Sequence, residues 1–196
     1  MNVALNLDIK LWQPGQAERR FSAQQLREQH RALKMDAQLI KAMMIDNLGI
    51  VLNIDGKEIS RCTCMYDGES SADLLQLYEN HLPDLLEKKP VTIHFYEEMT
   101  SWRLTPVGDD KMTWEILNTS KGQAKATMEQ SGECLRMPFI SSAIAWLSDA
   151  IATLELYQAE TKRSGGQDLS DQIDIAQRLY DYSFKTLTER GWQAST

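Results

Sequence analysis

The chain has 196 residues, 42% of them hydrophobic and 25% charged, and its formal net charge is −7 at pH 7. This length is enough for one well-formed core, and the composition excludes a largely disordered chain. The acidic balance disfavours broad nucleic-acid binding, which needs clustered Lys and Arg, and it permits a basic protein partner.

Two further patterns bear on where the chain resides. Its apolar runs are shorter than the roughly 18–20 residues that a membrane span needs, and its first residues, MNVALNLDIK, lack the basic segment of a signal peptide. The three cysteines, Cys62, Cys64 and Cys134, form no disulfide framework, and no Cys/His pair completes a zinc site with them. We therefore expect a cytoplasmic chain with reduced cysteines, no membrane contact, no metal and no cofactor.

The first predicted elements are a strand and a long helix. Apolar and polar residues alternate over residues 2–12, which is typical of a half-buried strand. Residues 21–49 then carry apolar residues at helical spacing. Ser22 and Gln25 form a capping-box pattern at the start of this range, and Gly49 stands where a helix would stop. The spacing predicts an amphipathic helix.

A hairpin and a second helical segment follow. Asp55-Gly56 separates two strand-like runs and favours a two-residue type I′ turn between antiparallel strands. Residues 67–90 predict a helix in which Pro83 introduces a kink or a break, because proline cannot donate a backbone hydrogen bond. The apolar side of this segment consists of Leu74, Leu77, Leu82, Leu85 and Leu86.

The middle of the chain returns to alternation and predicts a meander. Its three clearest strands lie at residues 91–96, 102–105 and 112–116. Residues 108–110, Gly-Asp-Asp, form the tight turn between the second and third of them. A fourth strand is expected near residues 123–130, with Ser131-Gly132 in the loop that follows it.

The C-terminal part predicts two helices. Residues 137–160 are apolar over a wide arc, as expected of a central core helix. Residues 163–167 read as a joint, and a second helix begins near Ser170, its expected cap. The expected buried stripe of this second helix consists of Ile173, Ala176, Tyr180, Phe184 and Leu187.

Taken together, the elements predict an α+β fold. An antiparallel meander sheet with an early β-hairpin would pack against several amphipathic helices, two of them C-terminal. We expect residues 1–163 to form a single domain and residues 164–168 to form a flexible joint. Residues 169–196 would then supply a C-terminal helix that docks on the same domain.

No catalytic or nucleotide-binding motif stands out. GxGxxG, GxxxxGK[ST], HExxH and G-x-S-x-G are absent, and Ser141 and Ser142 lie in an apolar helix where hydroxyls often bond back to the preceding turn. His94, Glu97 and Glu98 are the most tempting set. Strand parity separates His94 from Glu98 by about 13 Å and points Glu97 to the opposite face. We interpret this set as a solvated strand end.

The tryptophans allow two interpretations. Trp102 and Trp114 lie on adjacent predicted strands and share a face, so we expect both to pack in the core. The alternative is an exposed aromatic and acidic patch that binds a protein partner, since Trp and Tyr are favoured interface anchors. The residues of this expected patch are Tyr96, Glu97, Glu98, Trp102, Asp67, Glu69, Asp109 and Asp110.

The lack of a catalytic motif favours a binding protein. Our hypothesis is a non-catalytic cytosolic protein-binding domain, namely an acidic immunity or inhibitor protein that masks a basic toxin or enzyme. One alternative is an enzyme with a carboxylate-based site that the sequence does not reveal. Another is a structural or assembly subunit that forms a homo-oligomer through its long helices.

Overall fold

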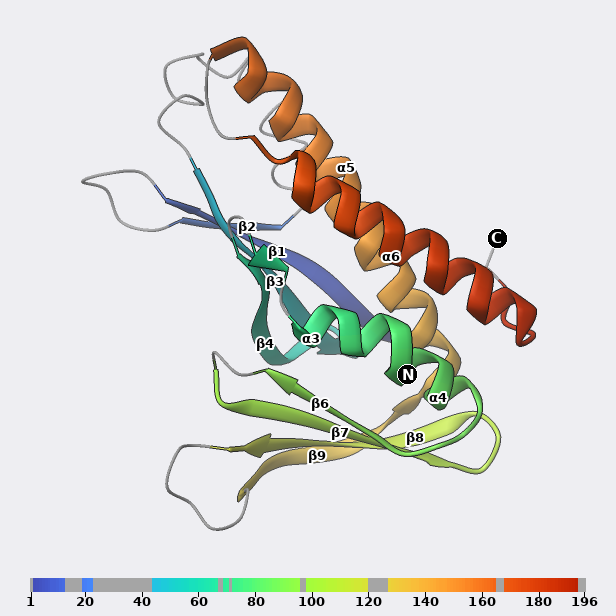
Figure 1. Ribbon diagram of the computed structural model, residues 1–196. Coiled ribbons are helices and arrows are strands. Elements are labelled where there is room, and N and C mark those ends of the chain that lie inside the picture. Colours follow the sequence, from blue (N-terminus) through green and yellow to red (C-terminus); the bar gives the residue numbers. More distant parts are fainter. Residues whose placement is uncertain are drawn as a thin grey trace.

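The structure, a computed structural model, describes residues 2–12, 19–22, 44–66, 69–70, 72–95, 98–119, 127–164 and 168–193. They form two antiparallel sheets and several helices (Figure 1). The five-stranded sheet has the order β2-β1-β3-β4-β5, and the four-stranded sheet has the order β6-β7-β8-β9. The predicted α+β class, with an early hairpin, an antiparallel meander and two C-terminal helices, is confirmed.

The elements follow one another in a simple order. The first sheet contains β1 (Val3–Trp12), β2 (Arg19–Ser22), β3 (Met44–Ile54), β4 (Lys57–Tyr66) and β5 (Glu69–Ser70). A helical segment comes next, made of α3 (Ala72–Leu75), the π-helix η1 (Gln76–His81) and α4 (Leu82–Leu86). The second sheet contains β6 (Val91–Phe95), β7 (Thr100–Val107), β8 (Lys111–Asn118) and β9 (Thr127–Leu135), and the helices α5 (Arg136–Ser164) and α6 (Ser170–Glu189) end the fold.

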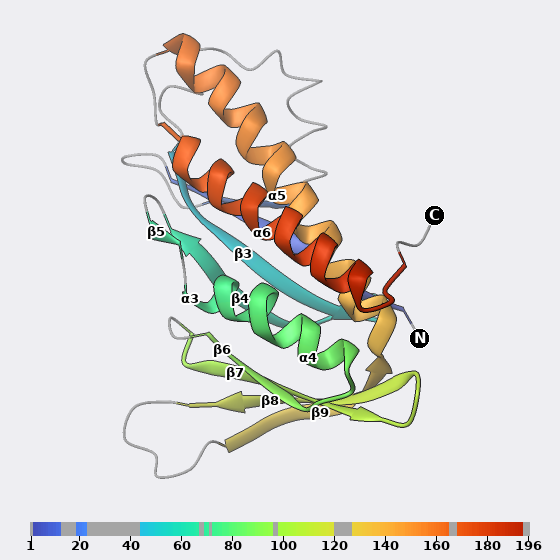
Figure 2. The same ribbon diagram turned by 45° about the vertical axis from the view of Figure 1, so that its right-hand side comes forward.

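The helices join the two sheets into one core. Helix α5 packs on β1, and α6 lies along α5. The segment α3–η1–α4 lies between the two sheets and contacts β4, β6 and α6 (Figures 1 and 2). A single cluster of buried apolar side chains runs through all of these layers. Burial of this cluster, rather than local helix or strand preference, holds the layers together.

The β3–β4 hairpin forms as predicted. Asp55 and Gly56 have φ angles of 50° and 78°, so both central residues of the turn lie in the left-handed region, as a type I′ turn requires. The turn is also tied to the start of the chain, because the backbone N–H of Asn2 donates to Oδ1 of Asp55 over 2.6 Å. The turn therefore sets the register of the β3–β4 pair, in which β3 is the central strand of the first sheet.

We predict that Gly56→Val lowers the free energy of unfolding by about 1 kcal/mol or more, because a β-branched residue resists positive φ. A Cβ at Gly56 would meet no atom within 4 Å, so the loss would report backbone strain and not a clash. Gly56→Asn is the control, since asparagine tolerates this conformation. Urea unfolding of the three proteins checks the prediction, and equal stability of the Val and Asn variants would contradict it.

The helix predicted over residues 21–49 is wrong at both of its ends. Residues 21–22 belong to β2 and residues 44–49 to β3, while residues 23–43 lie outside the described residues. Pairing of β3 with both β1 and β4 buries Leu48 and Ile50, and this tertiary pairing overrides the local helical spacing. Gly49 does not stop a helix, because it lies within β3 opposite Asp8. A Cβ there would approach the Cys62 carbonyl oxygen to 3.0 Å.

The fourth strand of the meander is shifted from its predicted position. It covers Thr127–Leu135 instead of residues 123–130, so Ser131 and Gly132 lie inside β9 and not in a loop. Gly132 pairs with Trp114, and a Cβ at Gly132 would come within 2.7 Å of the indole ring. The glycine is needed for the close approach of a large aromatic side chain, a use that the sequence pattern alone does not separate from a turn.

Pro83 does not break the helical segment. The chain passes through the π-helix η1, where the backbone N–H of Leu82 donates to the carbonyl oxygen of Leu77, five residues earlier. This wider turn accommodates a residue that lacks an N–H and would crowd a regular α-helix. The helical segment is thus not broken at Pro83, because the π-turn continues directly into α4.

Helix α5 is the predicted core helix. Residues Arg136–Ala159 are long and apolar enough to cross a membrane by length and composition alone, yet half of that window is buried inside the protein. We expected the hydroxyls of Ser141 and Ser142 to bond to the preceding turn of the helix. In the structure both accept hydrogen bonds from residues far away in the sequence. The indole N–H of Trp192 donates to Ser141 Oγ over 3.2 Å, and the backbone N–H of Leu5 donates to Ser142 Oγ. Helix α5 thus serves as a core helix of the α+β fold.

The buried stripe predicted for α6 is confirmed in part, since Ala176 and Leu187 are buried and Ile173 and Tyr180 are partly buried against the core. The buried residues of the helix are Gln172, Ala176, Leu179, Ser183 and Leu187. Phe184, expected in the core, is 38% exposed. Ser170 is the first residue of the helix and not its cap, and its backbone N–H donates to Oδ1 of Asp168 over 3.1 Å. Gln158 of α5 fixes this end of α6, since its side chain accepts from the backbone N–H of Leu169 and donates to Asp168.

Arg136, the first residue of α5, connects three elements. It is buried, and its guanidinium donates to the carbonyl oxygens of Leu85 and Leu86, both over 3.0 Å, and of Asp109 over 2.7 Å. Its backbone N–H donates to the Asp110 carbonyl oxygen over 2.8 Å. The C-terminus of α4, the β7–β8 turn and the start of α5 therefore meet at one side chain.

We predict that Arg136→Met lowers the free energy of unfolding by about 3 kcal/mol, because it leaves buried carbonyl groups without a donor. Arg103→Met is the matched control. Arg103 forms a largely exposed ion pair with Glu115 at 3.1 Å, and such pairs contribute about 1 kcal/mol or less. Denaturant unfolding compares the two, and an equal loss in both variants would show that Arg136 does not connect the elements as described.

Candidate protein-binding groove

Part of the expected patch falls outside what the structure describes. Asp67, Tyr96 and Glu97 lie outside the described residues, and so does the side chain of Glu69. The remaining members of the patch are Glu98, Trp102, Asp109 and Asp110. Each of these four is placed by the structure, and they do not form one exposed surface.

Trp102 is fully buried, and Trp114 is nearly so. The Trp102 ring packs against Phe95 with centroids 4.6 Å apart, and its indole N–H donates to Ser60 Oγ over 2.9 Å. The alternative in which Trp102 anchors a partner from an exposed patch is therefore wrong. Both tryptophans belong to the core, where an indole N–H needs an internal acceptor.

Glu98 and His94 serve the fold. Glu98 Oε1 accepts a hydrogen bond of 2.7 Å from the backbone N–H of Thr63, so it links the β6–β7 connection to β4 of the other sheet. His94 Nδ1 lies 2.8 Å from Ser101 Oγ, its neighbour across the β6–β7 pair. A carboxylate bound to a strand amide is a structural link between the sheets, and it is not the acidic rim that we expected.

Asp109 and Asp110 form the β7–β8 turn. The Asp109 carboxylate pairs with Lys88, and this ammonium group holds the pKa of the carboxyl below its ordinary value. The backbone carbonyl oxygens of both residues accept hydrogen bonds from Arg136. The negative charge of this turn is thus partly neutralised within the molecule.

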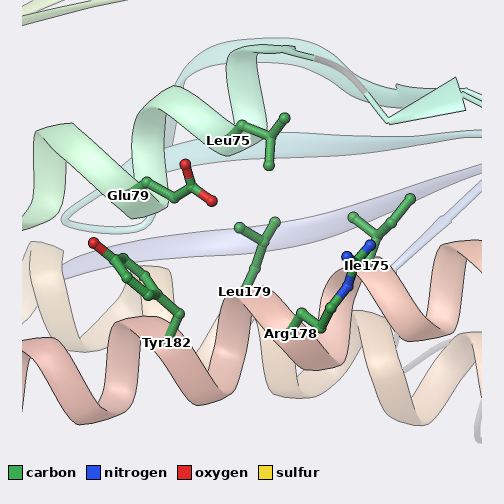
Figure 3. A pocket seen from close by; sticks show the side chains of 6 residues that line it. All are labelled: Leu75, Glu79, Ile175, Arg178, Leu179 and Tyr182. Atoms are coloured by element: carbon green, nitrogen blue, oxygen red, sulfur yellow. The ribbon is translucent and has the colours of Figure 1, made fainter.

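A concave surface lies elsewhere, between η1 and α6. It is an open groove of about 430 Å³. Its lining consists of Leu75, Glu79, Ile175, Arg178, Leu179 and Tyr182. Figure 3 shows the side chains of Leu75 and Glu79 reaching from the α3–η1 segment, while the other four reach from α6. The centre of the groove is apolar and its rim is polar, which is the composition of many protein-binding surfaces.

Two features position the walls of this groove. Ser183 is small and fully buried, and its hydroxyl donates to the Tyr78 carbonyl oxygen over 3.3 Å, which brings α6 close to η1. The π-turn before Pro83 rotates the residues of η1 relative to a regular helix, and π-turns are frequent at functional sites. Tyr78 faces inward and donates to the Ala143 carbonyl oxygen over 2.7 Å, while Glu79 faces the groove.

The two walls of the groove carry opposite charges. Glu79 comes from η1 and Arg178 from α6, and both side chains are exposed. Within the described residues neither of them forms an ion pair, and Arg178 makes only a long contact of 3.4 Å from Nε to the Asp174 carbonyl oxygen. Both charges are therefore available to a ligand that enters the groove.

Tyr182 is the aromatic residue of the groove lining. Its exposed fraction is 47%, and an amphipathic ring in this state can anchor a partner. We missed the groove in the sequence because the predicted stripe of α6 included Phe184, which is exposed, and left out Leu179, which is buried. The spacing of Ile175, Arg178 and Tyr182, three to four residues apart, marks the side of α6 that lines the groove and could have indicated it.

The described residues do not gather a metal site. Within the described ranges, no group of three or more His, Cys, Asp or Glu side chains lies close enough together to hold an ion. Cys62 and Cys134 are buried free thiols, and burial raises the pKa of Cys134 to about 12. A protonated thiol is a poor nucleophile and a poor ligand, so Cys134 acts as a small core residue, and Cys62 is likewise buried in the core.

His81 ends η1 in a partly buried position. Its Nε2 atom is buried without a hydrogen-bond partner among the described residues. Burial lowers the pKa of His81 below its ordinary value of 6.5, and the neighbouring His94 adds to this while Asp84 opposes it. The neutral imidazole is therefore favoured in the folded protein.

We predict that His81 makes stability fall on acidification. The unfolded chain binds a proton near pH 6.5 and the folded chain only at lower pH, so the contribution is complete above 6.5 and is lost as the pH falls below it. His81→Gln removes the titration and keeps a polar side chain. Urea unfolding between about pH 7.5 and pH 5.5 checks this, and equal slopes in the two proteins would contradict it.

Comparisons with protein-family models, curated proteins and solved structures give no match for this chain. The functional proposal therefore rests on the residues of this chain, above all on those of the groove.

Proposed function

We propose that this chain is a non-catalytic, cytoplasmic protein-binding domain that accepts a helical segment of another protein in the groove between η1 and α6. The observation that carries the proposal is the groove itself, with an apolar centre, an exposed tyrosine and two exposed charges on opposite walls. Amphipathic helices bind such grooves through apolar residues spaced three to four apart. Buried free cysteines are in keeping with a reducing compartment.

The charge of the chain favours a basic partner. A net charge of −7 attracts a basic protein over a distance of about 10 Å at 0.1 M salt and accelerates its association. Glu79 offers a direct contact for a Lys or Arg of the docked segment. An acidic inhibitor that masks a basic toxin or enzyme, as an immunity protein does, would combine these two properties. In this role the groove would determine the specificity of binding, and the overall charge would raise the association rate.

We predict that Tyr182→Ala weakens partner binding strongly without unfolding the chain. Truncation of an interface anchor costs about 2 kcal/mol or more, equivalent to a Kd about thirtyfold higher or more. Phe184→Ala is the control, because Phe184 is exposed to a similar degree but lies outside the groove lining. Immobilised wild-type and variant proteins would be used to capture partners from an extract of the native cell, and thermal melts would confirm that each variant is folded.

The expected result is a protein that the wild type and the Phe184→Ala variant retain and the Tyr182→Ala variant loses. Its association rate should fall as salt rises. Equal retention by all three proteins would place the binding surface elsewhere. If none of them retained any protein, the enzyme and self-assembly alternatives would be favoured.

A further inference from the structure

We propose that the same groove is also a contact surface between two copies of this chain, which pack around a two-fold axis near the midpoint of α6. Each α6 would lie in the groove between η1 and α6 of the other copy. This inference rests on the proposed docking role of the groove, and it names a second occupant, which would compete with a protein partner. A two-fold contact uses the same patch on both copies, so the patch must be complementary to itself.

The charges of the groove walls meet this requirement. Glu79 lies on one wall and Arg178 on the other, and neither has an ion-pair partner among the described residues. In a two-fold pair, Glu79 of each copy can approach Arg178 of the other, which gives two equivalent contacts. Walls of one sign would repel their own copy, whereas Glu79 and Arg178 attract each other at these two contacts.

The exposed stripe of α6 beside the groove supports an antiparallel arrangement. Asp171 and Asp174 lie in the first half of the helix and Lys185 in the second half, all exposed and on the side of Arg178 by helical spacing. Antiparallel copies place Asp174 of one helix near Lys185 of the other. Asp181 and Glu189 are further exposed acidic residues of this stripe in the second half of the helix, so that half is not basic overall.

The apolar part of the groove supplies the contact area. Tyr182 stands on the rim, half exposed, beside the buried Leu179 and the partly buried Ile175. Residue 179 lies at the middle of Ser170–Glu189, so a two-fold axis there brings Tyr182 of each copy over the apolar centre of the other groove. The pair would cover both tyrosines and leave no groove free for a partner.

The first test is the mass of the purified full chain in solution, measured by sedimentation over a range of concentrations. We expect the average mass to rise from that of one 22.4 kDa chain towards twice this value. Tyr182→Ala should raise the dimer dissociation constant at least tenfold, and Phe184→Ala should leave it unchanged. A wild type that stays monomeric up to about 1 mM would overturn the inference, and so would a dimer that Tyr182→Ala does not weaken.

The second test addresses the two charge contacts. E79R and R178E should each weaken the dimer about tenfold or more, because each variant has groove walls of one sign. An equimolar mixture of E79R and R178E should dimerise again, since each protein now carries charges opposite to those of the other. Weak single variants whose mixture stays monomeric would overturn the proposed pairing, as would single variants that dimerise like the wild type.

The results separate this inference from the proposed function. A chain that is monomeric at all concentrations and still loses its captured partner on Tyr182→Ala would reject the dimer and keep the docking role. A dimer that depends on Tyr182, together with no partner captured by any variant, would support the dimer and reject the role in binding another protein.

Discussion

The arrangement of the helices and the second sheet depends on the buried guanidinium of Arg136. A buried charge is costly unless it is hydrogen-bonded, and here three carbonyl oxygens from two elements accept from its two terminal nitrogens, while Nε is buried without a partner among the described residues. Two of these carbonyls belong to the C-terminal end of α4, where the helix dipole favours a cation. If the β7–β8 turn, α4 and α5 separated, the guanidinium would lose its hydrogen-bond acceptors. The second sheet and the helical layer are therefore held together as one unit.

This constraint extends to both walls of the groove. Helix α4 continues η1, and its last turn is linked to the end of α6 by the ion pair between Glu87 and Arg190. Ser183 fixes α6 to η1 at the middle, and Gln158 fixes the start of α6. The groove is therefore formed before any ligand arrives. A preformed surface loses little conformational entropy on binding, and more of the contact energy appears as affinity.

The sequence predicts those elements that local chemistry determines. Asp55-Gly56 favours its turn over other conformations, and the wide apolar arc of α5 matches its place in the core. The prediction failed where contacts with residues far away in the sequence determine the secondary structure. Residues 44–49 form a strand because β1 and β4 pair with them, and Gly132 lies in β9 because Trp114 occupies the space above it. The groove was missed for the same reason: the buried side of α6 is selected by Tyr78 and η1, which are about a hundred residues away in the sequence.

The charge of the chain ranks the two proposed occupants of the groove. Two copies of a chain with a net charge of −7 repel one another at long range, although Glu79 and Arg178 attract at contact. A basic protein meets no such repulsion and would be attracted both at long range and at contact. Specificity is a difference between two affinities. Here the acidic surface would lower the affinity for a second copy of the chain and raise the affinity for a basic partner. A copy of the chain would therefore occupy the groove at high concentration, and a basic partner arriving at lower concentration would displace it.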